Sequence, residues 1–425
     1  MQRTLLELIR CPACVGGQLA VERAVERELV YGDVAVSEIE RGTVVCQTCQ
    51  ARYPVEGYVL SFADRLSPSV RADGAFWGEF YARLSDYGIN GFLDTRCRPA
   101  PFVSMGVPET LPFEGEEWGG VHVTFAEHRW VRPGGLVVDV GVGSGWSSLF
   151  LARRGFRVIA FDPALELMQL AKRYAIAQGV QVEYLCADMA NTHLLPGSVD
   201  AVFAFHSLHH VPDPNGALEQ IHHMLREGGC LAIDEHLQDP PLLAMLRDAL
   251  YQEGVQTIFP RYRDPQLPSV PTSEHSENEG VGMEQLLPAI GRYLHIDTLE
   301  YRHIALDAVG PLYYLHKNGD PAALQTATEI IELIKRAMRR AWPDLLEYVT
   351  LVAQKRAELP AEPPPAVPSD PLLALSGRLQ QQDIEIARLH RMIAEKNSHI
   401  ERLERLIAGL ENGRAMRLLR WLGRR

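Results

Sequence analysis

The chain has 425 residues, enough for two or three domains, and 46% of them are hydrophobic, an ordinary value for globular proteins. Its formal net charge of −12 argues against tight, non-specific binding of nucleic acid by the chain as a whole. The sequence shows neither an apolar run long enough to span a membrane nor an N-terminal signal pattern, so we expect a cytoplasmic protein.

Two cysteine pairs lie near the start of the chain, Cys11 with Cys14 and Cys46 with Cys49. In a cytosolic chain, pairs with a two-residue gap point to a metal rather than to disulfides. Two such turns can supply four thiolates to one tetrahedral zinc ion, which leaves no open position for catalysis. We therefore predict a small module over residues 1–62 that is held together by a structural Zn²⁺.

This module has short strands expected at 19–23 and 42–45, followed by a turn and a further strand within 51–60. With the cysteine pairs, the pattern resembles the zinc ribbons related to the activator subunit of tRNA methyltransferases. A ribbon of this kind can position RNA. Residues 1–62, however, hold six arginines, no lysine and eight acidic residues, which is not an electrostatic footprint for phosphate. Nucleic acid is therefore not the expected substrate.

The segment 63–130 is rich in aromatic residues, among them Phe76, Trp77 and Trp118. We interpret it as a connector that folds over a ligand pocket as a lid and excludes water. The alternative is plain packing of helices against the edge of a sheet.

A glycine-rich turn follows. An apolar strand is expected at 136–140, then Gly141, Gly143 and Gly145, then a helix over 146–152. A strand, a glycine turn and a helix bring bare backbone and helix N–H groups against a nucleotide-like ligand. A second strand, 158–161, ends at Asp162, whose carboxylate can accept hydrogen bonds from both hydroxyls of a ribose.

Further strands are expected at 182–186, 201–205 and 230–234. With the run Asp139-x-Gly-x-Gly-x-Gly145, this order resembles the type 11 domain of class I S-adenosylmethionine-dependent methyltransferases, from 136 to 235. A nicotinamide fingerprint would instead need a glycine at Trp146. The resemblance implies an α/β fold with a Rossmann-like methyltransferase sheet, spanning residues 131–320.

The same resemblance implies how S-adenosylmethionine is bound. The three glycines would approach its methionine moiety and Asp139 would help to hold the ammonium group. Asp162 would bind the ribose and Asp188 the adenine amino group, with Met189 packed on the ring. Acceptors at the carboxyl ends of parallel strands fit the diol and the exocyclic amine of such a ligand.

A general base is needed only if the methyl acceptor must lose a proton. Candidates follow the fourth and fifth strands: His206, His209, His210, Glu235 and His236, of which His206, Glu235 and His236 are preferred. We interpret the neighbouring His209 and His210 as part of a structural turn, and a metal site built from these histidines is the other reading.

A helix is expected at 284–293, followed by strands at 296–301 and 305–314. Residues 321–357 are expected to be helical. Residues 358–371 contain six prolines and form a stiff linker.

Apolar residues repeat every seven positions over 372–411, which predicts a parallel two-stranded coiled coil and a homodimer. Residues 412–425 form a basic amphipathic tail that would contact an anionic membrane surface, unless it is a solvated end.

The sequence thus predicts a dimeric, zinc-stapled methyltransferase that acts on a small molecule, a sugar or a lipid-linked glycan. Two alternatives stay open. One is an RNA methyltransferase that uses the ribbon, and the other is a non-catalytic scaffold that binds partners through its coiled coil.

Overall fold

The computed structural model describes residues 1–86, 131–143, 145–189, 194–236, 281–302, 340 and 348–357. The strands are β1 (Leu19–Tyr31), β2 (Val34–Cys46), β3 (Arg52–Glu56), β4 (Val59–Ser61), β5 (Leu136–Val140), β6 (Arg157–Asp162), β7 (Glu183–Cys186), β8 (Val199–Phe205), β9 (Leu225–His236), β10 (His295–Arg302) and β11 (Tyr348–Gln354). The helices are α1 (Leu5–Leu8), α2 (Pro68–Asp86), α4 (Trp146–Arg153), α5 (Leu165–Ala177), α6 (Pro214–Met224) and α8 (Met283–Tyr293), with short 3₁₀ turns η1 (Ala63–Arg65) and η4 (Leu208–His210).

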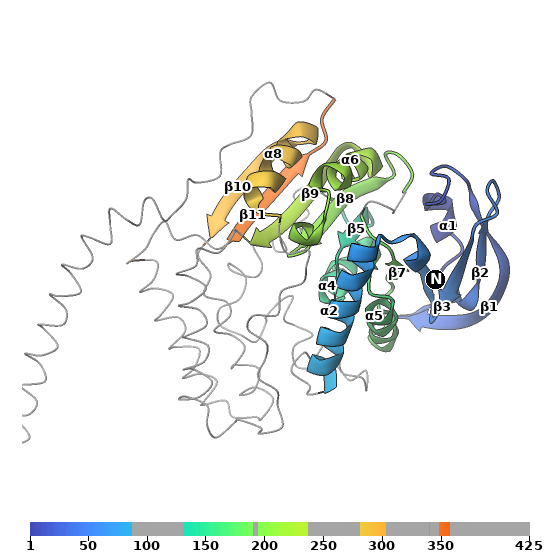
Figure 1. Ribbon diagram of the computed structural model, residues 1–425. Coiled ribbons are helices and arrows are strands. Elements are labelled where there is room, and N and C mark those ends of the chain that lie inside the picture. The colour runs from blue at the N-terminus through green and yellow to red at the C-terminus, as the bar shows by residue number, and fades with distance from the viewer. Residues whose placement is uncertain are drawn as a thin grey trace, which may run out of the picture. The chain divides into compact units, whose positions relative to one another are not determined.

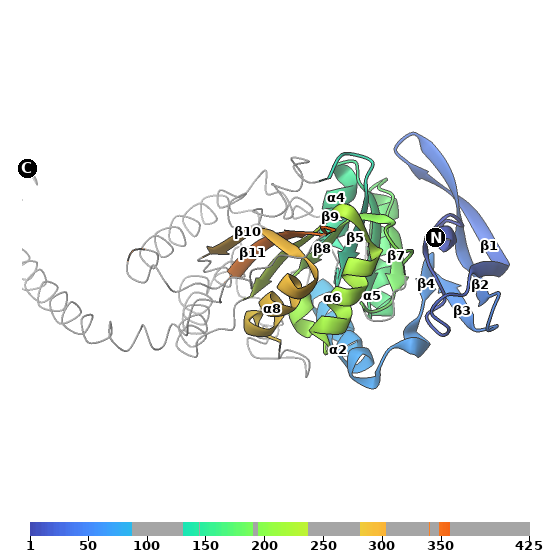
Figure 2. The ribbon, with the colours of Figure 1, turned by 90° about the horizontal axis from the view of Figure 1, so that it is seen from above.

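Five parallel strands in the order β7-β6-β5-β8-β9 form the centre of the sheet. All five residues of β5 are buried, as expected for a strand covered by helices on both faces. Helices α4 and α5 contribute to the core on one face, and α6 and α8, which lie side by side, to the core on the other (Figure 2). This arrangement confirms the expected Rossmann-like sheet and brings the carboxyl ends of its strands to one edge.

The far side of the sheet corrects one expectation. Residues 348–354, expected within a helical segment at 321–357, form strand β11 between β9 and β10 and run antiparallel to both. The side chains of Val349, Leu351, Val352 and Ala353 are all buried, so the apolar run fills a gap in the sheet rather than one face of a helix. The sheet therefore extends beyond the boundary expected at residue 320. The expected strand at 296–301 corresponds to β10, whereas that at 305–314 lies outside the described residues.

The N-terminal module is part of the same sheet. Strand β4 pairs antiparallel with β3 and parallel with β7, where Leu60 faces Leu185 and Ser61 faces Cys186. Figure 1 shows the N-terminal strands on the β7 side of the sheet, and Figure 2 labels β4 next to β7. The described strands thus form one sheet from β1 to β10. The boundary expected at residue 62 does not separate two independent cores.

The hairpin β1–β2 is longer than expected, with 13 residues in each strand. Its outer part carries charged residues that pair across the surface, such as Arg27 with Glu40 at 2.6 Å. A half-buried strand is recognised in a sequence by alternating apolar and polar residues, and the outer part of the hairpin lacks this alternation. The predicted strands are therefore shorter than the observed ones.

The connector is described only as far as residue 86. Helix α2 packs against α5, and a Cβ placed on Gly74 would lie 2.9 Å from the backbone carbon of Pro163. The start of the expected lid therefore lies close to the turn that follows β6. Its remainder (87–130) lies outside the described residues, as do the linker, the coiled coil and the tail (358–425). Among the helices that the structure describes, none is both long enough and apolar enough to cross a lipid bilayer.

A buried ion cluster joins the hairpin to helix α5. The Lys172 ammonium lies 2.8 Å from a carboxylate oxygen of Glu38 and 3.0 Å from the Tyr31 hydroxyl, and donates to the Val182 carbonyl at 2.9 Å. The amino nitrogen of Met1 lies 2.7 Å from the same carboxylate. The side chains of Lys172 and Glu38 are 0% exposed, so Lys172 depends on Glu38 for a counter-charge, and Glu38 depends on Lys172 and the Met1 amino group.

Replacing Lys172 by methionine should lower the free energy of unfolding by about 3–5 kcal/mol, because Glu38 would keep its buried charge without its main partner. Urea denaturation of Lys172→Met measures this loss, and the neighbouring exposed Arg173→Met is the control, for which little change is expected. Equal stability of the two variants would show that the buried pair does not hold the hairpin to α5.

Candidate functional site

The glycine turn after β5 has the backbone that the sequence predicts. Gly141, Gly143 and Gly145 have φ values of 64°, 47° and 80°, in the left-handed region that favours glycine. Gly145 is the N-cap of α4. A Cβ on Gly141 would lie 2.4 Å from the Cβ of Ser207, so the turn is in direct contact with the segment after β8.

Asp162 lies at the end of β6, where it faces this turn. One carboxylate oxygen accepts a hydrogen bond from the Gly143 N–H at 3.0 Å and the other from the Ala164 N–H at 2.9 Å. Burial raises the pKa of Asp162 to about 6, against the effect of these two donors and with a further contribution from the charge of Asp73 on α2. Each oxygen keeps a lone pair for a ligand hydroxyl, as the sequence-based assignment requires.

Asp139, on β5, is almost completely buried, with 1% of the residue exposed. One oxygen accepts from the hydroxyls of Ser147 at 2.7 Å and Ser148 at 2.6 Å, in the first turn of α4. Its other oxygen has no hydrogen-bond partner among the described residues. Burial raises the pKa of Asp139 to about 7. The sequence analysis missed the two serines, although hydroxyls in a helix that is otherwise apolar were a visible signal.

Asp188 and Met189 follow β7, and Met189 is 3% exposed. The N-terminal module contacts the chain on both sides of them. The Phe62 N–H donates to the Cys186 carbonyl at 2.8 Å, and the Leu195 N–H donates to the Leu8 carbonyl at 2.8 Å. The N-terminal module therefore makes hydrogen bonds on both sides of the two residues expected to contact adenine.

The expected bases are placed differently from one another. Glu235 is 0% exposed, and one of its oxygens accepts from the backbone N–H groups of Ser207 at 2.8 Å and Leu208 at 2.6 Å. This corrects the expectation that Glu235 faces an acceptor, since the carboxylate is enclosed by the turn that it caps. His206 is partly exposed and has a positive φ of 48°, and the side chain of His236 lies outside the described part of the structure.

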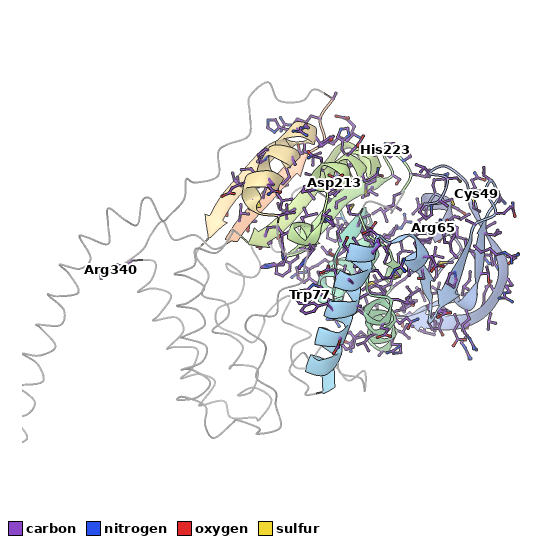
Figure 3. The ribbon with its side chains drawn as sticks, viewed as in Figure 1. Cys49, Arg65, Trp77, Asp213, His223 and Arg340 are labelled. Carbon is purple, nitrogen blue, oxygen red and sulfur yellow. The ribbon has the colours of Figure 1, made fainter. Side chains whose placement is uncertain are left out.

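His209 and His210 both lie in the turn η4, where each ring makes a different contact. The second oxygen of Glu235 lies 2.6 Å from Nδ1 of His209. The ring of His210 makes an edge contact with Trp77 of α2, at 5.4 Å between centroids (Figure 3 labels Trp77). Burial and the neighbouring His209 lower the pKa of His210 to about 3, so His210 stays neutral near pH 7.

The four cysteines form a compact cluster in the N-terminal module. Their sulfur atoms all lie within 4.8 Å of one another, with 3.6 Å between Cys11 and Cys49 and between Cys14 and Cys46. Tetrahedral thiolates at a Zn–S distance of about 2.3 Å are about 3.8 Å apart, so the donor set fits Zn²⁺. Across the described residues this is the one group of histidines, cysteines and acids close enough to share an ion, which gives no support to a histidine metal site after β8.

Two further residues support the cysteine cluster. A Cβ on Gly17 would lie 2.3 Å from the Cys46 sulfur, so this position has no room for a side chain. The Tyr53 hydroxyl lies 3.0 Å from the Cys11 sulfur and can donate to a thiolate.

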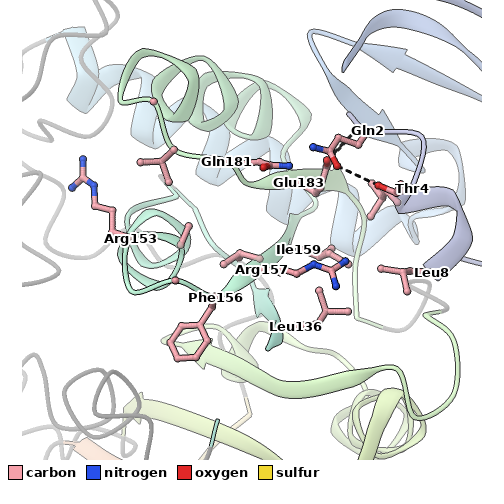
Figure 4. A pocket seen from close by; sticks show the side chains of 16 residues that line it. Gln2, Thr4, Leu8, Leu136, Arg153, Phe156, Arg157, Ile159, Gln181 and Glu183 are labelled. Atoms are coloured by element: carbon pink, nitrogen blue, oxygen red, sulfur yellow. Dashed lines mark hydrogen bonds between the residues drawn. The ribbon is translucent and has the colours of Figure 1, made fainter. Parts of the chain in front are cut away.

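A cavity of about 520 Å³ lies at the other end of the sheet (Figure 4). It is lined by Leu136 and Arg157, the first residues of β5 and β6, and by Gln2, Thr4 and Glu183. The glycine turn follows the carboxyl end of β5, which is where ligands of open parallel sheets bind. Because the cavity lies at the amino ends of β5 and β6, it is distinct from the glycine site.

Comparison with known proteins agrees with the geometry. Residues 138–233 match the family model described as a methyltransferase domain, close to the expected range of 136–235. The chain is 34% identical over 126 residues to a ubiquinone biosynthesis O-methyltransferase of Xanthomonas campestris pv. campestris (strain B100), covering 29% of this chain and 53% of that protein. It is 36% identical over 116 residues to the protein of the same name from Xylella fastidiosa (strain 9a5c), covering 27% and 46%. The chain thus spans about half the length of the curated relatives it matches.

Among solved structures, a phosphoethanolamine N-methyltransferase 2 of Haemonchus contortus in complex with S-adenosyl-L-methionine overlaps 56% of this chain and 53% of its own, at 16% identity and a TM-score of 0.38. The geranyl diphosphate C-methyltransferase of Streptomyces coelicolor A3(2) overlaps 57% of this chain and 81% of its own, at 18% identity and a TM-score of 0.35.

Alanine at Gly141 should destabilise the protein by more than alanine at Gly134. Both glycines have positive φ, at 64° and 83°, but a Cβ on Gly134 meets no atom within 4 Å. Gly134→Ala should therefore cost only the conformational term of about 1–2 kcal/mol, whereas Gly141→Ala adds a clash with Ser207. Thermal unfolding of both variants tests this, and equal costs would mean that the turn and Ser207 can move apart freely.

Proposed function

We propose that this chain, whose residues 138–233 match a methyltransferase domain, is an S-adenosylmethionine-dependent methyltransferase that acts on a small molecule. The observation that carries the proposal is the glycine turn in contact with the buried carboxylate of Asp162. When bound, the cofactor supplies a methyl group on a sulfonium that is already activated. The protein then contributes mainly alignment and a dry site.

The residues of the site fit this cofactor. A Cβ on Gly145 would lie 2.8 Å from the Cβ of Ala171 in α5, so close packing of the turn against this helix requires glycine there. Asp162 would accept from the ribose hydroxyls and Asp188 from the adenine amino group. The unpartnered oxygen of Asp139 would face the cofactor's ammonium group, either directly or through water.

The relatives named O-methyltransferases support a hydroxyl on a small molecule as the acceptor. A sugar or a lipid-linked glycan stays within this proposal. Use of the N-terminal module on RNA is less well supported, because its hairpin pairs an arginine with a glutamate, Arg27 with Glu40, rather than leaving a basic surface. A scaffold without turnover is disfavoured by the intact turn and its two acids.

We further propose that the four cysteines hold a structural Zn²⁺ ion, and that residues 372–411 form a coiled coil that joins two copies of the chain. The basic residues of 412–425 would then contact an anionic membrane surface. The last two proposals rest on the sequence pattern alone.

Asp162→Ala should weaken S-adenosylmethionine binding by about 1–3 kcal/mol, the cost of leaving ribose hydroxyls without their acceptor. Calorimetric titration measures this, with NAD as the ligand control. Asp213→Ala is the matched variant, because it removes a carboxylate that caps α6 by accepting from the Gly216 N–H at 3.1 Å. Since the ionised carboxylate is the form that accepts both hydroxyls, the affinity of the parent should fall as the pH drops through about 6. Unchanged affinity in Asp162→Ala would refute the placement of the ribose.

Purified protein should contain one zinc ion per chain, and its removal by a chelator should lower the thermal unfolding temperature, because metal binding in such modules contributes folding free energy. Cys14→Ser should lose the metal, whereas Cys230→Ala, a buried cysteine outside the cluster, should keep it. Elemental analysis and thermal scans decide the point. A parent protein without zinc that unfolds like the chelated sample would contradict the assignment.

A further inference from the structure

We propose that His209 is the group that removes the proton from the methyl acceptor, and that Glu235 is the positioning residue that holds its ring. The proposal rests on the proposed methyltransferase activity and makes its site specific for an acceptor hydroxyl. It also replaces Glu235 and His236 as candidate bases with a residue that the sequence analysis assigned to a structural turn.

The contacts of Glu235 fix the orientation of the imidazole. One carboxylate oxygen accepts from the N–H groups of Ser207 and Leu208, and the other lies 2.6 Å from Nδ1 of His209. An ionised carboxylate can only accept hydrogen bonds, so Nδ1 carries the proton and Nε2 is the basic nitrogen of the neutral ring. The same division of roles between a buried acid and a histidine is found in hydrolase triads.

The turn that carries His209 lies against the expected cofactor turn. Ser207, two residues earlier, is the residue that a Cβ on Gly141 would meet at 2.4 Å. Strand β8, which leads into this turn, is the direct neighbour of β5, which leads into the glycines. The side chain of His209 is 18% exposed, whereas Glu235 is 0% exposed. The turn that carries this partly accessible imidazole and its buried acid is therefore in contact with the glycine turn, where the cofactor is proposed to bind.

The other histidines of the segment are less suited to the role. Nε2 of His206 is 3.9 Å from the nearest Asp234 oxygen, beyond hydrogen-bond distance, so this contact does not fix its ring. The ring of His210 packs against Trp77, and its lowered pKa makes it a weak base.

Two titratable groups contact the His209 ring, Glu235 of β9 and His210 of η4. Further out, Asp73 of α2 lies 3.9 Å from His210, and Asp234 of β9 lies 3.9 Å from His206. The rings of His209 and His210 are 4.1 Å apart. Because His210 is neutral near pH 7, the main charge that faces His209 is that of Glu235.

The reaction step balances without a further reactant. The acceptor hydroxyl gives its proton to Nε2 of His209 while its oxygen forms a bond to the methyl carbon of the donor. The carbon–sulfur bond breaks, and its electron pair stays on sulfur. The products are a methyl ether, a neutral thioether and an imidazolium that later releases its proton to water. The substrate class is thus an alcohol or phenol that is not ionised at the working pH.

The test uses two acceptors of similar size, catechol and thiophenol. A phenol has a pKa near that of tyrosine, about 10, and needs a base, whereas an aromatic thiol is far more acidic and attacks as the thiolate. His209→Asn should lower the turnover rate with catechol by about 10²–10⁴-fold and that with thiophenol by no more than a few fold. The acid limb of the pH profile should disappear with catechol. His223→Asn, at an exposed histidine of α6 (Figure 3), is the matched control and should change neither rate.

A second measurement does not depend on turnover. NMR of protein labelled with ¹⁵N at the histidine rings reports the tautomer of each ring. The His209 signal is assigned by its absence from the spectrum of His209→Asn, and in the parent it should show the Nδ1–H tautomer at pH 8. In Glu235→Gln, the His209 ring should shift toward the Nε2–H form, because the amide can donate to Nδ1. The rate with catechol should fall as well, as it does in hydrolase triads when an amide replaces the acid and the histidine changes tautomer. An Nε2–H tautomer in the parent, or equal losses with both acceptors, would overturn the proposal.

Cofactor titration separates this proposal from the one on which it rests. His209→Asn and Glu235→Gln should bind S-adenosylmethionine as the parent does. A parent that does not bind the cofactor refutes the proposed function. A parent that binds and turns over catechol, with His209→Asn equally fast, refutes only the role of His209. If neither acceptor is turned over, the tautomer measurement alone decides.

Discussion

The buried charge of Lys172 is the constraint on which the architecture depends. An ammonium group that is 0% exposed needs acceptors on every side, and helix α5 with its own strand supplies only the Val182 carbonyl. The remaining acceptors, Glu38 and Tyr31, come from the hairpin of the N-terminal module. The Lys172 ammonium group therefore has its full set of acceptors only when the hairpin is in place, and the hairpin must be long enough to reach α5.

The same module also bears on the chemistry at the opposite end of the sheet. By pairing β4 with β7 and by bonding Leu8 to Leu195, it fixes the chain on both sides of Asp188. Cys11, a member of the four-cysteine cluster, follows Leu8 by three residues. The acids of the site are themselves buried and protonate more readily than free aspartates, as the raised pKa values of Asp139 and Asp162 show. Precise support of the backbone is what allows such acids to stay in place.

The sequence was sufficient where a local pattern carries the physics. The glycines after β5, the acid at the end of β6 and the paired cysteines each appear within a few residues, and the structure brings each set together as expected. It was insufficient where a contact joins distant parts of the chain. Lys172 and Glu38 are 134 residues apart, and nothing near Lys172 distinguishes it from a surface lysine of an amphipathic helix. Strand β11 pairs with β9 across more than 100 residues of intervening chain, so its apolar run looked like one side of a helix. Glu235 could be recognised as a cap only once β9 was placed beside the turn after β8.

The position of β4 has a consequence for how the protein works at low concentration. In the described sheet, the edge of β7 that faces away from β6 pairs with β4, a strand of the same chain. A separate subunit that paired there would dissociate on dilution, whereas a tethered strand meets its partner at an effective concentration in the millimolar range or above. The sheet thus keeps its support at any level of expression, and no second gene product has to be made in matching amount to occupy that edge.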